Sequence, residues 1–91
     1  MIEYIKLPAA VRVDHPSWPG FYILIVPNAD DTERAVYLTH EKMGVIHYLY
    51  GVCKQSDGIM ETMEETVETA YWNMEEYLPD FVRDCCTDET E

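Results

Sequence analysis

Seven apolar residues in the last third of this 91-residue chain recur every three or four positions, and this spacing constrains the fold more than any other feature. Such a period collects side chains on one face of an α-helix. We therefore expect a helix that starts at a cap, Ser56 or Asp57, and ends or kinks at Pro79, because proline removes a helical hydrogen bond. A short helical turn should follow Pro79. The apolar seam of this helix comprises Met60, Met63, Val67, Ala70, Met74, Tyr77 and Phe81.

The first 40 residues carry strand patterns instead. Residues 2–7 and 10–14 are short, mixed segments, and residues 21–26 are apolar at every position, which is typical of a strand buried on both faces. This strand should form a hairpin with residues 34–39 across the polar loop 27–33. The turn-rich segment 15–20 contains Trp18, which we expect to fold back over the edge of the core.

A second helical pattern follows at residues 41–53. Its apolar residues recur three or four apart, which predicts about three turns of helix capped by Thr39 or His40. Gly44 and Gly51 weaken this helix by about 1 kcal/mol each, so it would depend on packing against the sheet. The residues that carry the pattern are Met43, Ile46, Leu49 (or Tyr50) and Cys53.

Together these patterns predict a small α+β fold in which an antiparallel sheet of three to four strands packs against two C-terminal helices, in the order ββββαα. Residues 1–86 form a single domain in this interpretation, and residues 87–91 form a flexible acidic tail.

Sequence features also suggest a compartment. The longest apolar run is too short for the roughly 20 residues that cross a bilayer, and the first residues lack the pattern of a signal peptide. The odd number of cysteines, Cys53, Cys85 and Cys86, favours reduced thiols. We therefore expect no membrane association and a cytoplasmic location, the host cytoplasm if the gene belongs to a phage.

Charge is distributed unevenly. The chain has 18 acidic and 6 basic residues, a net charge of −12, but residues 1–56 are nearly neutral. Residues 57–91 hold twelve of the acids and a single base, Arg83. No lysine or arginine lies between Lys54 and Arg83. This asymmetry indicates one acidic face, a property that governs association more than fold.

The acidic residues of the last predicted helix form the candidate site. Like charges three and four residues apart repel, which costs about 1–2 kcal/mol over four close pairs. A helix face needs charge for solubility, but an ordinary face mixes both signs. The unmixed face instead predicts a basic protein partner, with aromatic anchors beside the charges. The residues concerned are Glu61, Glu64, Glu65, Glu68, Tyr71, Trp72, Glu75, Glu76 and Asp80.

A nucleic-acid-binding protein with a basic groove is the partner that this pattern favours. Carboxylates four residues apart on a helix are separated by about 6 Å along its axis, a spacing similar to that of backbone phosphates. The composition is similar in kind to that of small acidic inhibitors of nucleases, restriction systems or CRISPR effectors, including anti-CRISPR proteins of phages. We therefore expect a non-enzymatic inhibitor that mimics nucleic acid and does not bind nucleic acid directly.

Other functional classes have weaker support. A small structural or regulatory homodimer, joined through the methionine seam, is the principal alternative. Gly44 replaces the second histidine of a His-Glu-x-x-His zinc site, and the cysteines lack Cys-x-x-Cys spacing. The loop with Asp30, Asp31 and Glu33 lacks the features of a calcium loop. We therefore predict no catalytic residue, no metal site and no cofactor.

Overall fold

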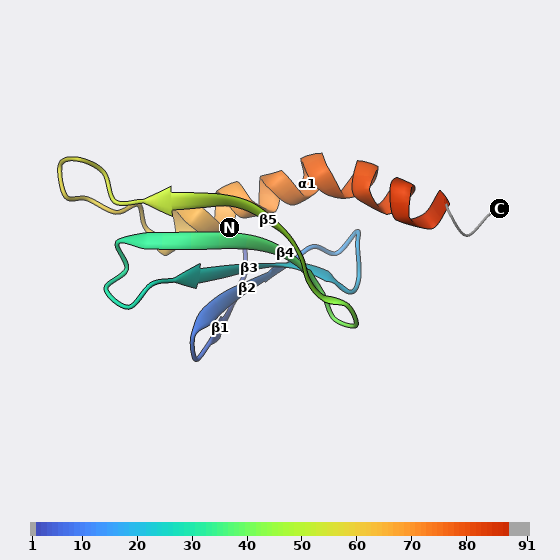
Figure 1. Ribbon diagram of the computed structural model, residues 1–91, viewed down its shortest axis with the longest axis horizontal. Helices are drawn as coiled ribbons and strands as arrows, with labels where there is room; N and C mark the ends of the chain where they lie inside the picture. Colours follow the sequence, from blue (N-terminus) through green and yellow to red (C-terminus); the bar gives the residue numbers. More distant parts are fainter. Residues whose placement is uncertain (1, 88–91) are drawn as a thin grey trace.

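A five-stranded antiparallel sheet and one long helix make up the fold (Figure 1). The computed structural model of the chain describes residues 2–87, and the side chains of residues 2–83. The strands pair in chain order, each with the next, so the sheet is a meander. The elements are β1 (Ile5–Leu7), β2 (Ala10–Asp14), β3 (Phe21–Pro27), β4 (Glu33–His40), β5 (Gly44–Cys53) and α1 (Met63–Thr87). The α+β class is confirmed, but the predicted number of strands and helices is wrong.

The predicted helix at residues 41–53 is in fact the edge strand β5. This segment is rich in β-branched and aromatic residues, which favour strands, and so many of its positions are apolar that a helical period fits it by chance. Gly44 adopts a φ of 78° at the turn from β4. Cys53, expected on the sheet-facing side of a helix, is instead exposed at the end of this strand.

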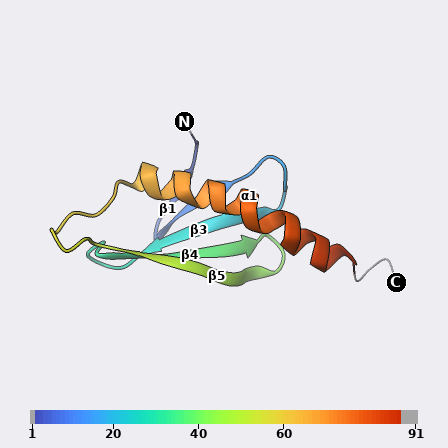
Figure 2. The same cartoon turned by 90° about the horizontal axis from the view of Figure 1, so that it is seen from above.

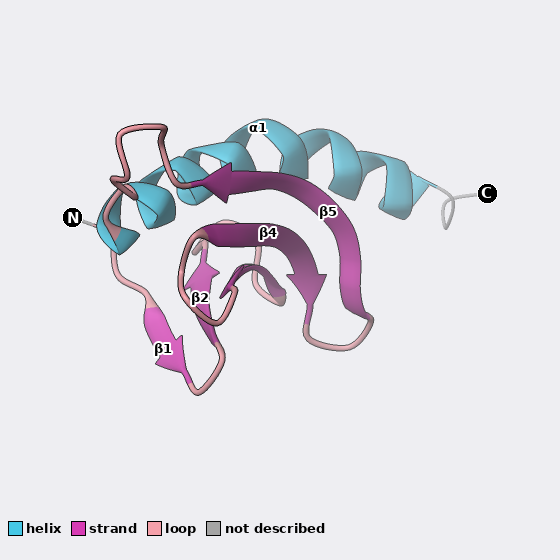
Figure 3. Ribbon diagram, turned by 60° about the vertical axis from the view of Figure 1, so that its left-hand side comes forward, coloured by secondary structure: helices cyan, strands magenta, loops and turns pink. Residues whose placement is uncertain are grey.

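Two β-bulges shape the edge strand. Val36 pairs with Tyr50 and Tyr37 with Tyr48, so Leu49 is an extra residue in β5; Ile46 is extra in the same way between His47 and Val45. Bulges bend a strand and increase its twist, and Figure 3 shows β4 and β5 bending strongly toward the turn that joins them.

The helix starts later than predicted and does not stop at its proline. Its cap is Thr62 and not Ser56 or Asp57: the Thr62 hydroxyl accepts a hydrogen bond from the Glu65 backbone N–H at 3.1 Å, and Glu65 Oε1 accepts one from the Thr62 N–H at 2.9 Å. This is a capping box. Pro79 lies inside the helix, which continues to Thr87 without a break. Of the predicted tail at 87–91, Thr87 is the last residue of α1, and residues 88–91 lie outside the described residues.

Replacing Thr62 with alanine is expected to lower the free energy of unfolding by about 1 kcal/mol, because the helix loses its N-terminal cap. Thermal or urea unfolding measures this change. Thr69→Ala is the matched control, since Thr69 is exposed within the helix and alanine is the better helix former. An equal loss of stability in both variants would contradict the role of the capping box.

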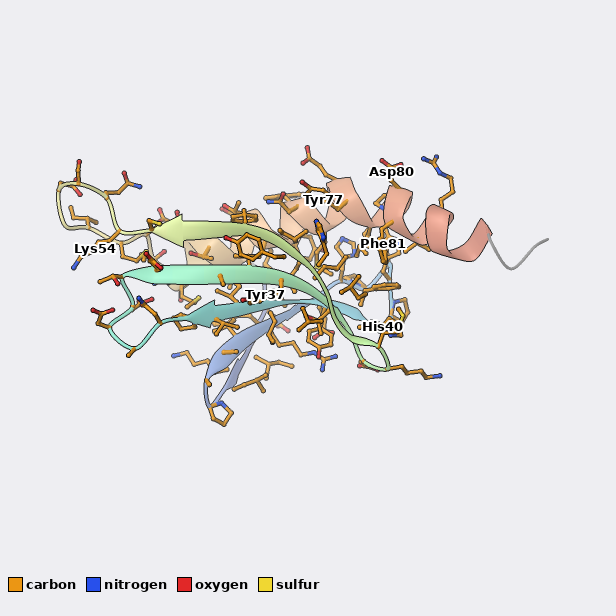
Figure 4. All side chains as sticks on the ribbon, in the orientation of Figure 1. Tyr37, His40, Lys54, Tyr77, Asp80 and Phe81 are labelled. Atoms are coloured by element: carbon orange, nitrogen blue, oxygen red, sulfur yellow. The ribbon has the colours of Figure 1, made fainter. Side chains whose placement is uncertain are left out.

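Helix α1 lies across one face of the sheet and contacts β2 and β3 (Figure 2). The core lies between them, and its fully buried residues include Ile23, Ile25, Met74 and Leu78. Val67, Ala70 and Met74 of the predicted seam are buried against the sheet, as expected. Leu78 is buried with them, whereas Met60 precedes α1 and Tyr77 is 47% exposed. Figure 4 shows Phe81 on the sheet side of the helix and Asp80 pointing away.

Helix α1 is longer than the strands. Its 25 residues span about 37 Å, so its C-terminal end projects past the sheet (Figures 1 and 2).

In the part of the chain that the structure describes, no helix lies on the opposite face of the sheet. Strand β3 accordingly alternates between buried Ile23 and Ile25, which face α1, and half-buried Tyr22, Leu24 and Val26, which face the other side. The expectation that this strand is buried on both faces is thus wrong, because residues 2–87 form only one helix to cover the sheet. Trp18 packs against the edge of the core, as predicted.

A buried arginine joins the β3–β4 loop to the start of α1. Arg34, 5% exposed, donates two hydrogen bonds to the Asp31 carboxylate, at 2.9 and 2.8 Å, and one to the Thr66 hydroxyl at 2.7 Å. The Thr66 hydroxyl in turn donates to Glu61 at 2.6 Å. The hydrogen bonds from Arg34 lower the pKa of Asp31 below its usual value. We call these four residues the Arg34 network.

Candidate functional site

Seven of the nine predicted site residues are exposed on α1. They cover the sides of the helix that do not pack on the sheet, because residues three and four apart in a helix are neighbours on its surface. We call them the acidic face: Glu64, Glu65, Glu68, Trp72, Glu75, Glu76 and Asp80. The structure thus brings these side chains together on one element.

The other two predicted residues have structural contacts. Glu61 precedes the first residue of α1 and belongs to the Arg34 network. Burial raises the pKa of Tyr50, and the negative charge of Glu61 raises it further. Tyr71 is half-buried, and its ring stacks on His15 with 4.5 Å between centroids. Glu61 is therefore not part of the exposed acidic surface, and Tyr71 lies beneath it.

Several acidic side chains of this helix have partners within the fold. Part of the excess of acidic over basic residues in the helix therefore has a structural role. Glu65 closes the capping box, Glu64 accepts a hydrogen bond from the Tyr4 hydroxyl at 2.9 Å, and Glu75 lies 3.0 Å from His15 Nε2. Asp80 forms an ion pair with Arg83 at 2.8 Å. Glu68 and Glu76 make no hydrogen bond or ion pair with any side chain that the structure describes.

The contact between Tyr4 and Glu64 holds the N-terminal segment against the helix. Hydrogen bonds from its own backbone N–H and from the Tyr4 hydroxyl lower the pKa of Glu64, and the nearby charge of Lys6 adds to this. The same contact raises the pKa of Tyr4, since the phenol donates to a carboxylate. Glu64 therefore stays ionised at neutral pH and keeps its place in the acidic face.

A cavity of about 460 Å³ opens beside the acidic face. It lies at the point where β1 stops pairing with β2: β1 pairs only with residues 10–12, so the segment before Ile5 leaves the sheet and runs toward the helix. Trp72 and Tyr71 of α1 form one wall. The full lining comprises Ile2, Glu3, Tyr4, Ile5, Arg12, Asp14, Pro16, Tyr71 and Trp72.

A buried histidine supports the aromatic wall. His15 is 5% exposed, and its Nδ1 accepts the Ser17 backbone N–H at 3.1 Å, so the ring hydrogen is on Nε2 and is donated to Glu75. The His15 ring lies against Tyr71 on one side and 4.5 Å from Trp18 on another. Tyr71 is thereby fixed in place, and it holds Trp72 edge-on, with 5.7 Å between centroids and 89° between planes.

Arg12 forms part of another wall, and its charge is already matched. It is hydrogen-bonded to Asp14 at 2.9 Å and to Glu41 at 2.8 Å, and these bonds raise its pKa. Its guanidinium lies 3.9 Å from the centroid of the Tyr22 ring. One cation thus faces two carboxylates, and the lining of the cavity has a negative balance.

A smaller cavity of about 250 Å³ adjoins the helix nearby. Its lining is Ile2, Glu64, Glu65 and Glu68, so Ile2 borders both cavities. The larger cavity therefore has the carboxylates of the acidic face next to it.

Sequence reasoning missed the N-terminal side of this site. Ile2, Tyr4, Asp14 and His15 join it through contacts that span about 60 residues of chain, such as the hydrogen bond from Tyr4 to Glu64. No local period or motif signals such a contact. The aromatic members Tyr71 and Trp72 were found because they lie among the glutamates of one helix.

The part of the chain that the structure describes contains no group of three or more histidine, cysteine, aspartate or glutamate side chains arranged to hold a metal ion. None of its helices has the length and apolar character needed to cross a membrane.

The sequence was compared with protein-family models, with curated proteins and with solved structures. The chain matches no family model, no curated protein and no solved structure.

Proposed function

We propose that this chain is a non-enzymatic protein that binds a basic surface of another protein through the acidic face of α1. The observation that carries the proposal is the exposure of seven side chains on one helix, six of them carboxylates, without a basic residue in that helix before Arg83. Of these, Glu68 and Glu76 have no partner among the described side chains. Their charge is available to another molecule.

Electrostatics explains why such a face would favour binding. A surface of one sign raises the rate of encounter with a surface of the opposite sign and disfavours partners with the wrong charge. Trp72 is 55% exposed at the centre of the face, and tryptophan is enriched among the residues that contribute most to interface affinity. Charge would select the partner, and Trp72 would anchor it.

The most concrete form of the proposal is an inhibitor that covers the nucleic-acid-binding groove of its target. Successive turns of α1 place carboxylates about 5–6 Å apart along the axis, and a groove that binds phosphates offers basic side chains at comparable intervals. A helix about 10 Å wide also fits a groove built for a nucleic-acid strand.

Capture from nuclease-treated lysate of the source cell tests this proposal. The wild-type chain should retain a nucleic-acid-binding protein at low salt, and the variant Glu68→Lys/Glu76→Lys should bind it at least about tenfold more weakly, because two attractive contacts become repulsive. Both substitutions leave the capping box, the bond from Tyr4 and the Arg34 network intact. Mass spectrometry identifies the retained protein, and calorimetry measures the affinity.

The matched control is Asp30→Lys/Glu33→Lys, which changes one exposed residue of the β3–β4 loop and the exposed first residue of β4, both outside the acidic face. Each lysine that replaces a carboxylate raises the net charge by two, so both double variants carry −8 instead of −12. Measured at physiological ionic strength, where the Debye length is about 8 Å, the control should retain the partner within about twofold, because screening limits the effect of a changed exposed charge to its own neighbourhood. Equal losses in the two variants would mean that overall charge, and not the acidic face, determines binding.

A further inference from the structure

The cavity beside the acidic face has walls of a kind that recognise an organic cation. Trp72 is 55% exposed and lines the cavity together with Tyr71 and Tyr4. The Trp72 and Tyr71 rings are perpendicular, with an interplanar angle of 89°, and Tyr71 is held from behind by His15. The Trp72 ring therefore has a rigid neighbour and remains largely uncovered. A volume of about 460 Å³ is also within the range of about 300–1,000 Å³ typical of ligand pockets.

The charge around this cavity is complementary to a cation. Glu3 and Asp14 line it, Arg12 is the one base among the described residues of its lining, and Arg12 is already bonded to Asp14 and Glu41. Beyond Ile2, the adjoining small cavity adds Glu64, Glu65 and Glu68. A positive side chain that enters beside Trp72 would thus meet an aromatic face and would lie among more carboxylates than bases.

Arginine fits these walls better than lysine. Its guanidinium is planar, stacks on aromatic rings and is more weakly hydrated than an ammonium group, so it loses less on entering a partly apolar cavity. The protein holds one of its own arginines in this manner: Arg12 lies 3.9 Å from the centroid of Tyr22 and is bonded to two carboxylates.

We propose that the cavity lined by Tyr4, Tyr71 and Trp72 receives an arginine side chain of the basic partner, stacked on the indole of Trp72. This inference rests on the proposed function and specifies its chemistry. The acidic face attracts any basic surface, whereas the cavity selects partners that present an arginine at the corresponding position.

Two synthetic peptides of equal charge test the inference. The probes are N-acetylated, C-amidated (Gly-Arg)₄ and (Gly-Lys)₄, and their affinities for the folded chain are measured by calorimetry at low salt. The arginine peptide should bind about fivefold more tightly, the ratio that corresponds to a cation–π contact of about 1 kcal/mol. Trp72→Ala should reduce its affinity to that of the lysine peptide, whose own affinity should change less than about twofold.

Three further variants separate the cavity from the acidic face. Trp72→Phe should retain part of the preference for arginine, since phenylalanine keeps an aromatic face. Tyr77→Ala removes another exposed aromatic ring of α1 that does not line the cavity, and it should change neither affinity. Glu68→Lys/Glu76→Lys should weaken both peptides alike and leave their ratio unchanged.

Several results would overturn the inference. These are equal affinities of the two peptides for the wild type, a preference for arginine that survives Trp72→Ala, and no binding of either peptide. If the peptides bind equally and Glu68→Lys/Glu76→Lys weakens both, the acidic face acts by charge alone, so the proposed function stands without the arginine cavity. The capture experiment tests the proposed function independently of both peptides.

Discussion

Met74→Ala is expected to lower the free energy of unfolding by about 3 kcal/mol. Met74 is completely buried between α1 and the sheet, and truncation of such a side chain removes its burial energy and leaves a cavity. Because small domains are stable by only about 5–15 kcal/mol, this loss would lower the midpoint of denaturation substantially. Urea unfolding followed by circular dichroism measures it.

Tyr77→Ala is the control on the same helix. The sequence pattern assigns Tyr77 to the apolar seam, but the residue is 47% exposed, so its truncation should cost less than about 1 kcal/mol. A larger loss for Tyr77→Ala than for Met74→Ala would mean that α1 is rotated relative to the sheet. The comparison therefore tests the orientation on which the exposure of the acidic face depends.

Arg34→Ala is expected to lower the free energy of unfolding by about 2–3 kcal/mol. The substitution removes two hydrogen bonds to Asp31 and one to Thr66, and hydrogen bonds to charged groups contribute about 1.5–3 kcal/mol. It also removes the positive charge that interacts with the half-buried Glu61. Equilibrium unfolding in urea again measures the effect.

Arg83→Ala is the matched control for this prediction. Arg83 is 71% exposed and pairs with Asp80 at the surface, where an ion pair contributes about 0–1 kcal/mol. If the two arginine variants lost equal stability, the Arg34 network would not fasten the β3–β4 loop to α1.

The long helix was predictable because apolar residues recur in it at helical spacing. Val67, Ala70 and Met74 recur at helical spacing between polar residues, and they are buried as expected. The segment that became β5 was misassigned because apolar residues fill most of its positions, so spacing alone did not distinguish helix from strand. Its aromatic and β-branched content was the better signal. The capping box was also readable as Thr62 followed three residues later by Glu65.

The two sides of the candidate site differed in how far sequence could predict them. The acidic face lies on one helix, so spacing places its members together. The cavity depends on Tyr4 and Asp14 meeting Trp72 across more than 50 residues of chain, and such a meeting depends on where β1 leaves the sheet. The homodimer predicted from the sequence would use the methionine seam as its interface, but the helix residues of this seam pack against β2 and β3. Dimerisation therefore stays a prediction, and it would need another surface.

Competition with nucleic acid is the most direct test of the proposed inhibitor. The protein retained in the capture experiment is first bound to the fluorescently labelled nucleic acid that it recognises, and the chain is then added while fluorescence anisotropy is recorded. Wild type should release the nucleic acid, and Glu68→Lys/Glu76→Lys should require at least about tenfold more protein to do so. A stable complex that contains the chain, its partner and the undisplaced nucleic acid would contradict the account.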